Sequence, residues 1–285
     1  MRVVLIQLAV NDTEDLSGRF QRAEQLLRTI EEANRNQKEA YSKPDLILFP
    51  ELWGCGFQNF SAYQEEAEEL KGRTWAFMSS WAKRLHCWIH GGSFVEKQKS
   101  FTESGEKTDF YNTSVLFDRA GCDTGIYRKI HLFGFESMEQ KILTAGNLIT
   151  ELETEFGRTG MTTCYDLRFP EQFRVQTVQV PQLFLVTAAW PGARLGHWRL
   201  FNQVRAVENQ CYVISCNAAG TQCGVVGGGH SMVTDPWGHV LAEGSDGEEI
   251  IWCDLDLNRV SECREQFPAL KDRKSLQRTG EGGNQ

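Results

Sequence analysis

The 285-residue sequence lacks the long apolar and basic runs that mark membrane proteins and nucleic-acid-binding proteins. No window approaches the ~20 consecutive apolar residues of a membrane-spanning helix, and no cluster of lysine and arginine offsets the net charge of −8. A surface of that sign repels phosphate backbones. We therefore expect neither a membrane nor a nucleic acid among the partners of this protein.

Paired cysteines are also absent, although the chain has nine cysteines. None forms a Cys-x-x-Cys pair, and the closest trio, Cys211, Cys216 and Cys223, has no histidine at the spacing of a zinc site. The apolar run in the N-terminal stretch MRVVLIQLAVND is too short for a signal peptide. We predict that this stretch forms a first strand. These features predict a cytoplasmic protein with reduced, mostly buried cysteines and no bound metal.

The sequence does contain the alternation of strands and helices that is typical of an α/β protein. Apolar, β-branched runs typical of buried strands recur at 2–10, 45–52, 88–96, 112–118, 160–166, 183–190, 211–217, 230–235 and 248–256. Apolar residues at helical spacing indicate helices over 16–39, 62–85 and 195–209. Because no Pro/Ser-rich linker interrupts the pattern, we expect one domain over residues 1–272 and a polar tail over 273–285.

Two charged residues stand in contexts that suggest a catalytic site. Glu51, in ILFPELWGCGF, directly follows an apolar strand and a proline, and strand ends of this kind bind ligands in α/β sheets. Lys129, in GIYRKIHLFGF, is a cation among apolar neighbours and is suited to stabilising negative charge. Each residue has an ordinary alternative, since Glu51 fits a solvated loop and Lys129 fits a surface lysine with a buried stem.

Cys164 has the most distinctive setting of the nine cysteines. In TGMTTCYDLRFPEQF a strand-like run ends at Cys164, and Asp166 and Pro170 then provide helix-start chemistry. A cysteine at such a turn has the geometry of a nucleophile elbow, where the following backbone amides face the sulfur. The alternative is a buried structural cysteine.

Together and in this order, these segments resemble the nitrilase, or carbon–nitrogen hydrolase, superfamily. The resemblance extends from RVVLIQLAV to about Asp272 and includes FPELWGCGF, YNTSVLFDRAG, YRKIHLFGF, CYDLRFPE and RAVENQCYVISCNAAG. It implies an α/β fold, a single-domain four-layer αββα sandwich, commonly assembled as a homodimer or higher homo-oligomer. It also implies a Glu-Lys-Cys triad formed by Glu51, Lys129 and Cys164.

The resemblance further implies a second glutamate between the lysine and the cysteine. In this family it usually stands several residues before a glycine that precedes the next strand. In ESMEQKILTAGN that glycine is Gly146, which selects Glu139, and Glu136 is the alternative.

The chemistry implied by the resemblance is cleavage of a carbon–nitrogen bond through a covalent thioester, without a metal or an organic cofactor. Glu51 would take the proton of Cys164 and later activate water. Lys129 and the backbone N–H of Tyr165 would stabilise the oxyanion. Glu139 would position Glu51 or the substrate.

Within the superfamily the sequence is most similar to the omega-amidase branch, on the segments HLFGFESMEQKILTAGN, AAWPGARLGHW and REQFPALKD. This similarity implies a small-molecule amide substrate, a 2-oxo dicarboxylic acid monoamide such as 2-oxoglutaramate, cleaved to the acid and ammonia. The distal carboxylate of that substrate needs a cation or amide donors. Arg168, Arg194 and Arg205 are candidates, and Trp190 is either a pocket wall or a plain core residue.

Other interpretations stay open at the level of sequence. The protein could be an amidase for an N-carbamoyl compound or a deaminated peptide, or a non-catalytic binding subunit on the same fold. A cysteine-dependent redox sensor would need a resolving cysteine beside Cys164. We expect His131 and His230 to be structural, and Asp166 and Arg168 to hold the turn as an ion pair. The Gly-rich segment 224–231 matches neither a dinucleotide fingerprint nor a phosphate loop and is interpreted as a turn.

Overall fold

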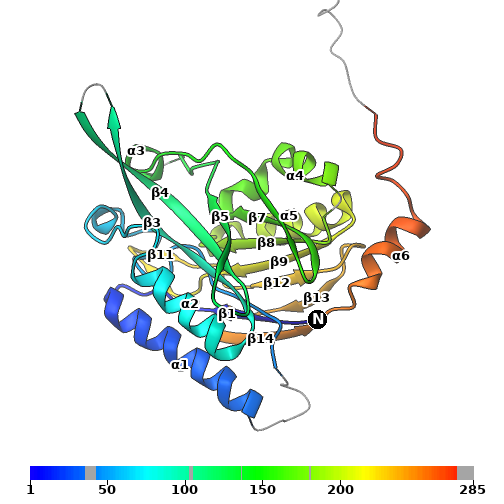
Figure 1. Ribbon diagram of the computed structural model, residues 1–285, viewed down its shortest axis with the longest axis horizontal. Coiled ribbons are helices and arrows are strands. Elements are labelled where there is room, and N and C mark those ends of the chain that lie inside the picture. Colours follow the sequence, from blue (N-terminus) through cyan, green and yellow to red (C-terminus); the bar gives the residue numbers. More distant parts are fainter. Residues whose placement is uncertain (36–42, 103–104, 136, 180, 275–285) are drawn as a thin grey trace, which may run out of the picture.

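The computed structural model describes residues 1–35, 43–102, 105–135, 137–179 and 181–274. Two six-stranded sheets lie at its centre (Figure 1). The first has the strand order β14 (Glu249–Asp254), β1 (Arg2–Gln7), β2 (Leu46–Leu48), β3 (Trp88–Thr102), β4 (Gly105–Phe117) and β5 (Asp123–Arg128). The second has the order β13 (Val240–Glu243), β12 (Met232–Thr234), β9 (Tyr212–Asn217), β8 (Leu183–Ala188), β7 (Gly157–Thr163) and β6 (Thr150–Thr154).

Helices cover the outer face of each sheet. The main helices are α1 (Leu16–Arg35) and α2 (Arg73–Leu85) on the first sheet, and α4 (Pro170–Gln176) and α5 (Leu195–Asn209) on the second. The smaller elements are α3 (Glu139–Ile142), α6 (Asn258–Gln266), the hairpin of β10 (Thr221–Gln222) and β11 (Val225–Val226), and the 3₁₀ helices η2 (Phe60–Ala62), η3 (Cys164–Arg168), η4 (Thr177–Gln179) and η5 (Gly192–Arg194). No helix in the described ranges is long and apolar enough to cross a bilayer.

The central strands are apolar at every position because both of their faces are covered. Successive side chains of a strand point to opposite faces. In β1, Val3 and Leu5 therefore pack between the two sheets, while Val4 and Ile6 pack beneath α1 and α2. The strand β8 divides in the same way between the intersheet core and the layer of α4 and α5. The result is the four-layer αββα sandwich, so the predicted fold class is confirmed.

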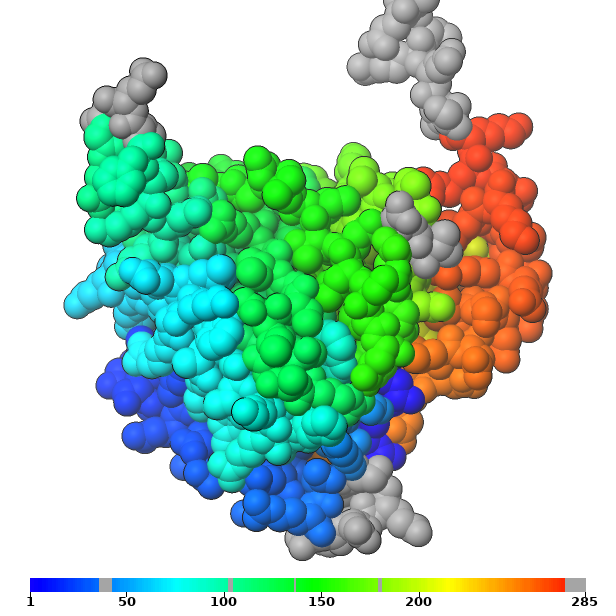
Figure 2. All heavy atoms as spheres, viewed as in Figure 1, coloured from blue at the N-terminus to red at the C-terminus, as the bar shows by residue number. Residues whose placement is uncertain are grey.

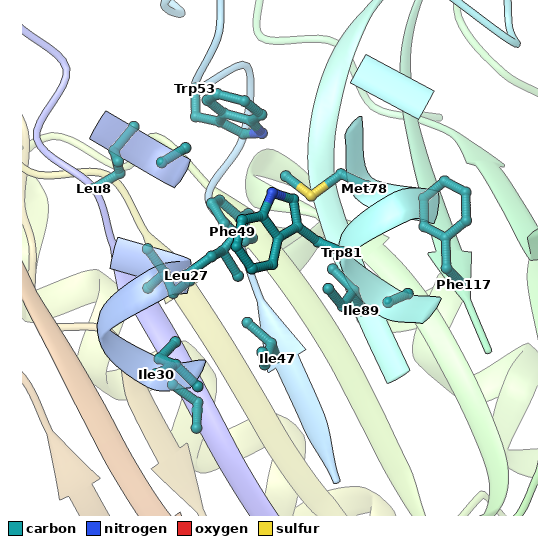
Figure 3. Close-up of a cluster of buried hydrophobic side chains, with 14 of the residues drawn as sticks. Leu8, Leu27, Ile30, Ile47, Phe49, Trp53, Met78, Trp81, Ile89 and Phe117 are labelled. Atoms are coloured by element: carbon teal, nitrogen blue, oxygen red, sulfur yellow. The ribbon is translucent and has the colours of Figure 1, made fainter. Parts of the chain in front are cut away.

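The helical layer over the first sheet shows how helical spacing produces this packing. Leu27 and Ile30 of α1 and Met78 and Trp81 of α2 belong to one buried cluster, together with Ile47 of β2 (Figure 3). The predicted helix over 195–209 is observed as α5. The helix predicted over 16–39 is observed as far as residue 35, and positions 36–39 lie outside the described residues.

The helix predicted over 62–85 begins eleven residues later, at Arg73. Glu68 explains the difference, because its backbone N–H donates to the carbonyl of Val95 (2.9 Å) and ties the segment to the edge of β3. The carboxylate of Glu68 then accepts the N–H of Thr74 (2.7 Å) in the first turn of α2. The apolar residues before Arg73 therefore pack from an irregular segment.

The strands predicted at 88–96 and 112–118 are longer than expected and form one hairpin. β3 and β4 remain paired out to Thr102 and Gly105, and the outer half of this hairpin stands away from the rest of the molecule (Figures 1 and 2). Its residues are largely polar and exposed, so the apolar pattern does not mark them. Residues 275–285, most of the predicted tail, lie outside the described residues.

Candidate active site

Glu51, Lys129 and Cys164 follow three different strands whose ends meet between the two sheets. Glu51 comes after β2, and its backbone N–H donates to the carbonyl of Ala188 (3.2 Å) at the end of β8. Lys129 comes directly after β5, and Cys164 directly after β7. The face-to-face packing of the sheets thus brings together residues that are more than 110 positions apart in the sequence.

The ammonium group of Lys129 lies between two buried carboxylates. Lys129 Nζ donates to Glu51 Oε1 (2.8 Å) and to both oxygens of Glu139 (2.9 and 3.0 Å). None of the three side chains has exposed surface. Burial lowers the pKa of Lys129, but Glu139 and Glu51 outweigh it and hold that pKa above its ordinary value. Lys129 is therefore a permanent cation at this site.

Backbone and amide N–H groups complete the coordination of both carboxylates. Asn112 Nδ2 donates to Glu51 Oε1 (2.8 Å) and to Glu139 Oε1 (3.2 Å). The N–H of Ala189 reaches Glu51 Oε2 (2.9 Å), and the N–H of Phe133 reaches Glu139 Oε2 (2.6 Å). Burial raises the pKa of Glu139, and Lys129 opposes that rise. Glu139, the residue that the family resemblance implied, lies in the cluster, whereas the alternative Glu136 lies outside the described residues.

Sequence reasoning missed Asn112, Ala189 and Phe133. Two of them act through the backbone N–H, which every residue except proline carries, so no side-chain pattern marks them. Asn112 stands in YNTSVLFDRAG, a segment that contributed to the family resemblance without a chemical role. The available signal was an asparagine at the first position of the strand predicted over 112–118.

Cys164 occupies the sharp turn predicted for a nucleophile. Its backbone is left-handed (φ 48°), β7 ends at the preceding residue, and η3 begins at Cys164 itself. Such a conformation is strained for a residue with a side chain. Burial and the adjacent, hydrogen-bonded carboxylate of Glu51 raise the pKa of the Cys164 thiol, while Lys129 and the Ala189 N–H oppose this. The site therefore presents a protonated thiol next to a carboxylate acceptor.

Asp166 holds the turn, but Arg168 is not its partner as predicted. The buried carboxylate accepts the N–H of Thr163 (2.9 Å), the hydroxyl of Tyr127 (2.6 Å) and Nδ1 of His131 (2.8 Å). The imidazole of His131 also stacks on Phe169 at 3.7 Å. Asp166 faces the core because four donors surround it there, counting the backbone N–H of His131 (3.0 Å).

A pocket opens in front of Cys164. Its wall includes Tyr165, whose backbone N–H is the predicted oxyanion donor, together with Trp190 and the two cations Arg168 and Arg194. The guanidinium of Arg168 lies 4.7 Å from the ring centre of Trp190. Within the described part of the chain neither arginine has a carboxylate partner. Trp190 is thus both buried and part of the pocket wall.

Arg205, the third predicted cation, lies outside this pocket. It is buried and donates to the carbonyl of Leu167 (2.8 Å) and to Glu208 (2.7 Å). Its charge is therefore already used in holding α5 against η3. Of the residues described, no group of three or more His, Cys, Asp or Glu side chains is arranged to hold a metal ion.

The carbon–nitrogen hydrolase family profile matches residues 2–265. The chain belongs to the carbon–nitrogen hydrolase family. It is 36% identical over 277 residues to 2-oxoglutaramate amidase of Paenarthrobacter nicotinovorans, covering 96% of this chain and 89% of the relative. It is 31% identical over 286 residues to human omega-amidase NIT2, covering 96% and 95%.

A solved structure of the same family has the same fold. Saccharomyces cerevisiae Nit3, a member of branch 10 of the nitrilase superfamily, superimposes with a TM-score of 0.79 at 30% identity, covering 94% of each chain. The family resemblance found from the sequence is therefore confirmed, and this carbon–nitrogen hydrolase is an enzyme.

Proposed function

We propose that the protein hydrolyses the terminal amide of a 2-oxo dicarboxylic acid monoamide, such as 2-oxoglutaramate, to the acid and ammonia. The observation that carries this proposal is the pocket, in which the thiol of Cys164 and the guanidinium groups of Arg168 and Arg194 line the same space. A guanidinium binds a carboxylate through paired hydrogen bonds. An acyl chain with a carboxylate at one end and an amide at the other fits between these groups, and relatives named for this activity support the assignment.

The cluster supports a two-step mechanism. Glu51 accepts the thiol proton while Cys164 Sγ attacks the amide carbon, and Lys129 with the Tyr165 N–H stabilises the resulting oxyanion. The carbon–nitrogen bond then breaks, and the nitrogen leaves as ammonia with the proton that Glu51 had taken. Glu51 next takes a proton from water, and the hydroxide adds to the thioester carbon. The carbon–sulfur bond then breaks, the acid is released, and the sulfur of Cys164 takes the proton back from Glu51. Glu139 keeps Lys129 and Asn112 oriented toward Glu51.

The test is ammonia release from a panel comprising 2-oxoglutaramate, succinamate, an N-carbamoyl amine, a deaminated peptide amide and a nitrile. We expect the dicarboxylate monoamides to be the best substrates. Cys164→Ser should reduce their turnover by roughly 10³-fold or more. Cys122→Ser, a change at an exposed free cysteine, is the matched control and should leave turnover unchanged.

Two outcomes would contradict the proposal in different ways. Preferred turnover of another panel member, also lost in Cys164→Ser, would retain the nucleophile and refute the substrate. Equal activity of Cys164→Ser and the unmodified enzyme would refute the mechanism.

We further propose that the protein works as a homodimer that uses the outer face of α4 and α5. Large apolar side chains are exposed along this face, at Val175 of α4 and at Leu200, Val204 and Val207 of α5. Leu200, Val204 and Val207 recur at helical spacing and form one stripe. Sedimentation should show that the unmodified protein is a dimer and that Val204→Glu is a monomer. A monomeric unmodified protein would refute the dimer, and a dimer for both proteins would refute this interface.

We also propose a cytoplasmic location. All nine cysteines are free thiols, and several lie in the core, as expected in a reducing compartment. Fractionation of cells that express the tagged protein tests this placement.

A further inference from the structure

A second chamber adjoins the catalytic pocket on the side of Glu51. The two spaces adjoin, and four residues line both of them: Phe57, Gln58, Ala189 and Pro191. Cys164 lines only the first space, and Glu51 lines only the second. The nucleophile and its base therefore face adjoining parts of one cleft.

The second chamber is small and almost uncharged. Among the described residues, Glu51 is the only ionisable side chain in its wall. The remaining wall is mostly aliphatic, from Val10, Ala218, Ala219, Gly220, Val225 and Gly227. Its polar side chains are Gln58 and Gln222, and Gln222 Oε1 is occupied by the N–H of Gln58 (2.8 Å). Part of the Gly-rich segment 224–231 thus forms a wall beside the catalytic base.

The division of the cleft matches the two sides of an amide. The acyl part of the substrate lies with Arg168 and Arg194, because these cations face the first space. The nitrogen must lie near Glu51, because that carboxylate returns the proton to it as the carbon–nitrogen bond breaks. Any substituent on the nitrogen is then directed into the second chamber.

We propose that this chamber is a leaving-group subsite for small uncharged alkyl groups, and that the enzyme therefore also hydrolyses N-methyl and N-ethyl amides of its acid. The inference rests on the proposed function. Cys164 Sγ bonds to the amide carbon, the carbon–nitrogen bond breaks, and the nitrogen leaves as methylamine or ethylamine with the proton held by Glu51. Water then cleaves the thioester, so that amide and water give one acid and one amine.

The experiment compares kcat/KM for 2-oxoglutaramate and its N-methyl and N-ethyl derivatives, measured by release of the 2-oxo acid. The chamber predicts turnover of both derivatives, abolished by Cys164→Ser. Val225→Phe fills the chamber from β11 and should lower kcat/KM for the N-ethyl amide roughly tenfold or more relative to the primary amide. Val226→Phe is the matched control, because neighbouring strand residues point to opposite faces and Val226 is 61% exposed.

Each result has a defined meaning. Turnover of the primary amide without any turnover of the N-methyl amide would overturn the subsite and leave the proposed function intact. The same conclusion follows if Val225→Phe and Val226→Phe change the ratio of N-ethyl to primary amide equally. Inactivity toward all three amides would refute the proposed function and the subsite with it. Should Val225→Phe fail to fold, Val225→Ala enlarges the chamber and must raise the relative rate of an N-propyl amide.

Discussion

Replacing Lys129 by methionine tests whether the buried cluster is an electrostatic unit. Methionine has nearly the length and volume of lysine, so the substitution removes the charge with little change in packing. The unmodified cluster contains one ammonium and two carboxylates, in which Lys129 Nζ is 2.8 Å from Glu51 and 2.9 Å from Glu139. In Lys129→Met the two carboxylates remain buried without a cation.

The expected loss of stability follows from these distances. At about 3 Å and an effective dielectric constant near 20, each ammonium–carboxylate contact contributes about 5 kcal/mol before the desolvation cost of the charges is subtracted. Removing one partner of a buried pair costs about 3–5 kcal/mol in measured cases. Because both carboxylates here lose the same partner, we expect Lys129→Met to lower the free energy of unfolding by at least that amount near neutral pH.

The pH dependence has a definite sign. The pKa of Glu139 already lies above its ordinary value, and loss of Lys129 raises it further. The folded variant then binds more protons than the unfolded chain between the unfolded and folded pKa values, so folding stability falls as the pH rises through this window. The deficit of Lys129→Met should therefore be larger at about pH 8 than at about pH 5.

These effects are measured by urea unfolding of four proteins: the unmodified enzyme, Lys129→Met, Glu139→Gln and the double variant. The double variant has the same net charge in the cluster as the unmodified enzyme. It should therefore be more stable than Lys129→Met alone, with a coupling energy well beyond the ~0.5 kcal/mol of independent sites. A deficit below about 1 kcal/mol, or one that does not vary with pH, would refute the description of the cluster as a charged unit.

Three further predictions concern the pocket and the turn. Arg168→Gln should raise KM for a dicarboxylate monoamide about 10- to 100-fold and leave KM for a neutral amide nearly unchanged; equal effects on both would exclude a carboxylate contact. Asp166→Asn should lower the free energy of unfolding by about 2–4 kcal/mol, measured in urea, because one donor around that carboxylate then faces an amide N–H₂. Iodoacetamide labelling of Cys164, followed by peptide mass spectrometry, should still rise with pH beyond about 10, where an ordinary thiol with a pKa of about 8.5 has levelled off, because burial raises the pKa of this thiol; a plateau at lower pH would show a preformed thiolate.

The sheets could be predicted because their signal is local. Strands such as β8 are apolar on both faces, and α5 repeats its apolar residues at helical spacing, so each element carries its own pattern. The described residues in the outer half of the β3–β4 hairpin are largely polar and exposed, so they carry no apolar pattern. The helix prediction was wrong before Arg73 for the opposite reason. That segment contains apolar residues, but they pack without forming a helix.

In the site, the side-chain groups could be predicted from the sequence and the backbone groups could not. Glu51, Lys129 and Cys164 stand at strand ends, where their residue types are informative in the sequence. Ala189 contributes only a backbone N–H, which becomes visible once β8 is aligned beside β2. Asp166 was expected to pair with Arg168 because the two are close in the sequence. The structure instead places Asp166 under His131, 35 residues away.

The buried cluster also connects stability to catalysis. Its hydrogen bonds come from β4 through Asn112, from the loop after β5 through Lys129 and Phe133, and from the end of β8 through Ala189. The groups that orient Glu51 and Glu139 are thus supplied by both sheets, and they are in place only when the sandwich is closed. Because these donors already point at the carboxylate oxygens, little reorientation is needed when Glu51 exchanges a proton with the thiol. A substitution that loosens the packing between the two sheets should therefore lower activity before it unfolds the protein, even when it lies far from Cys164.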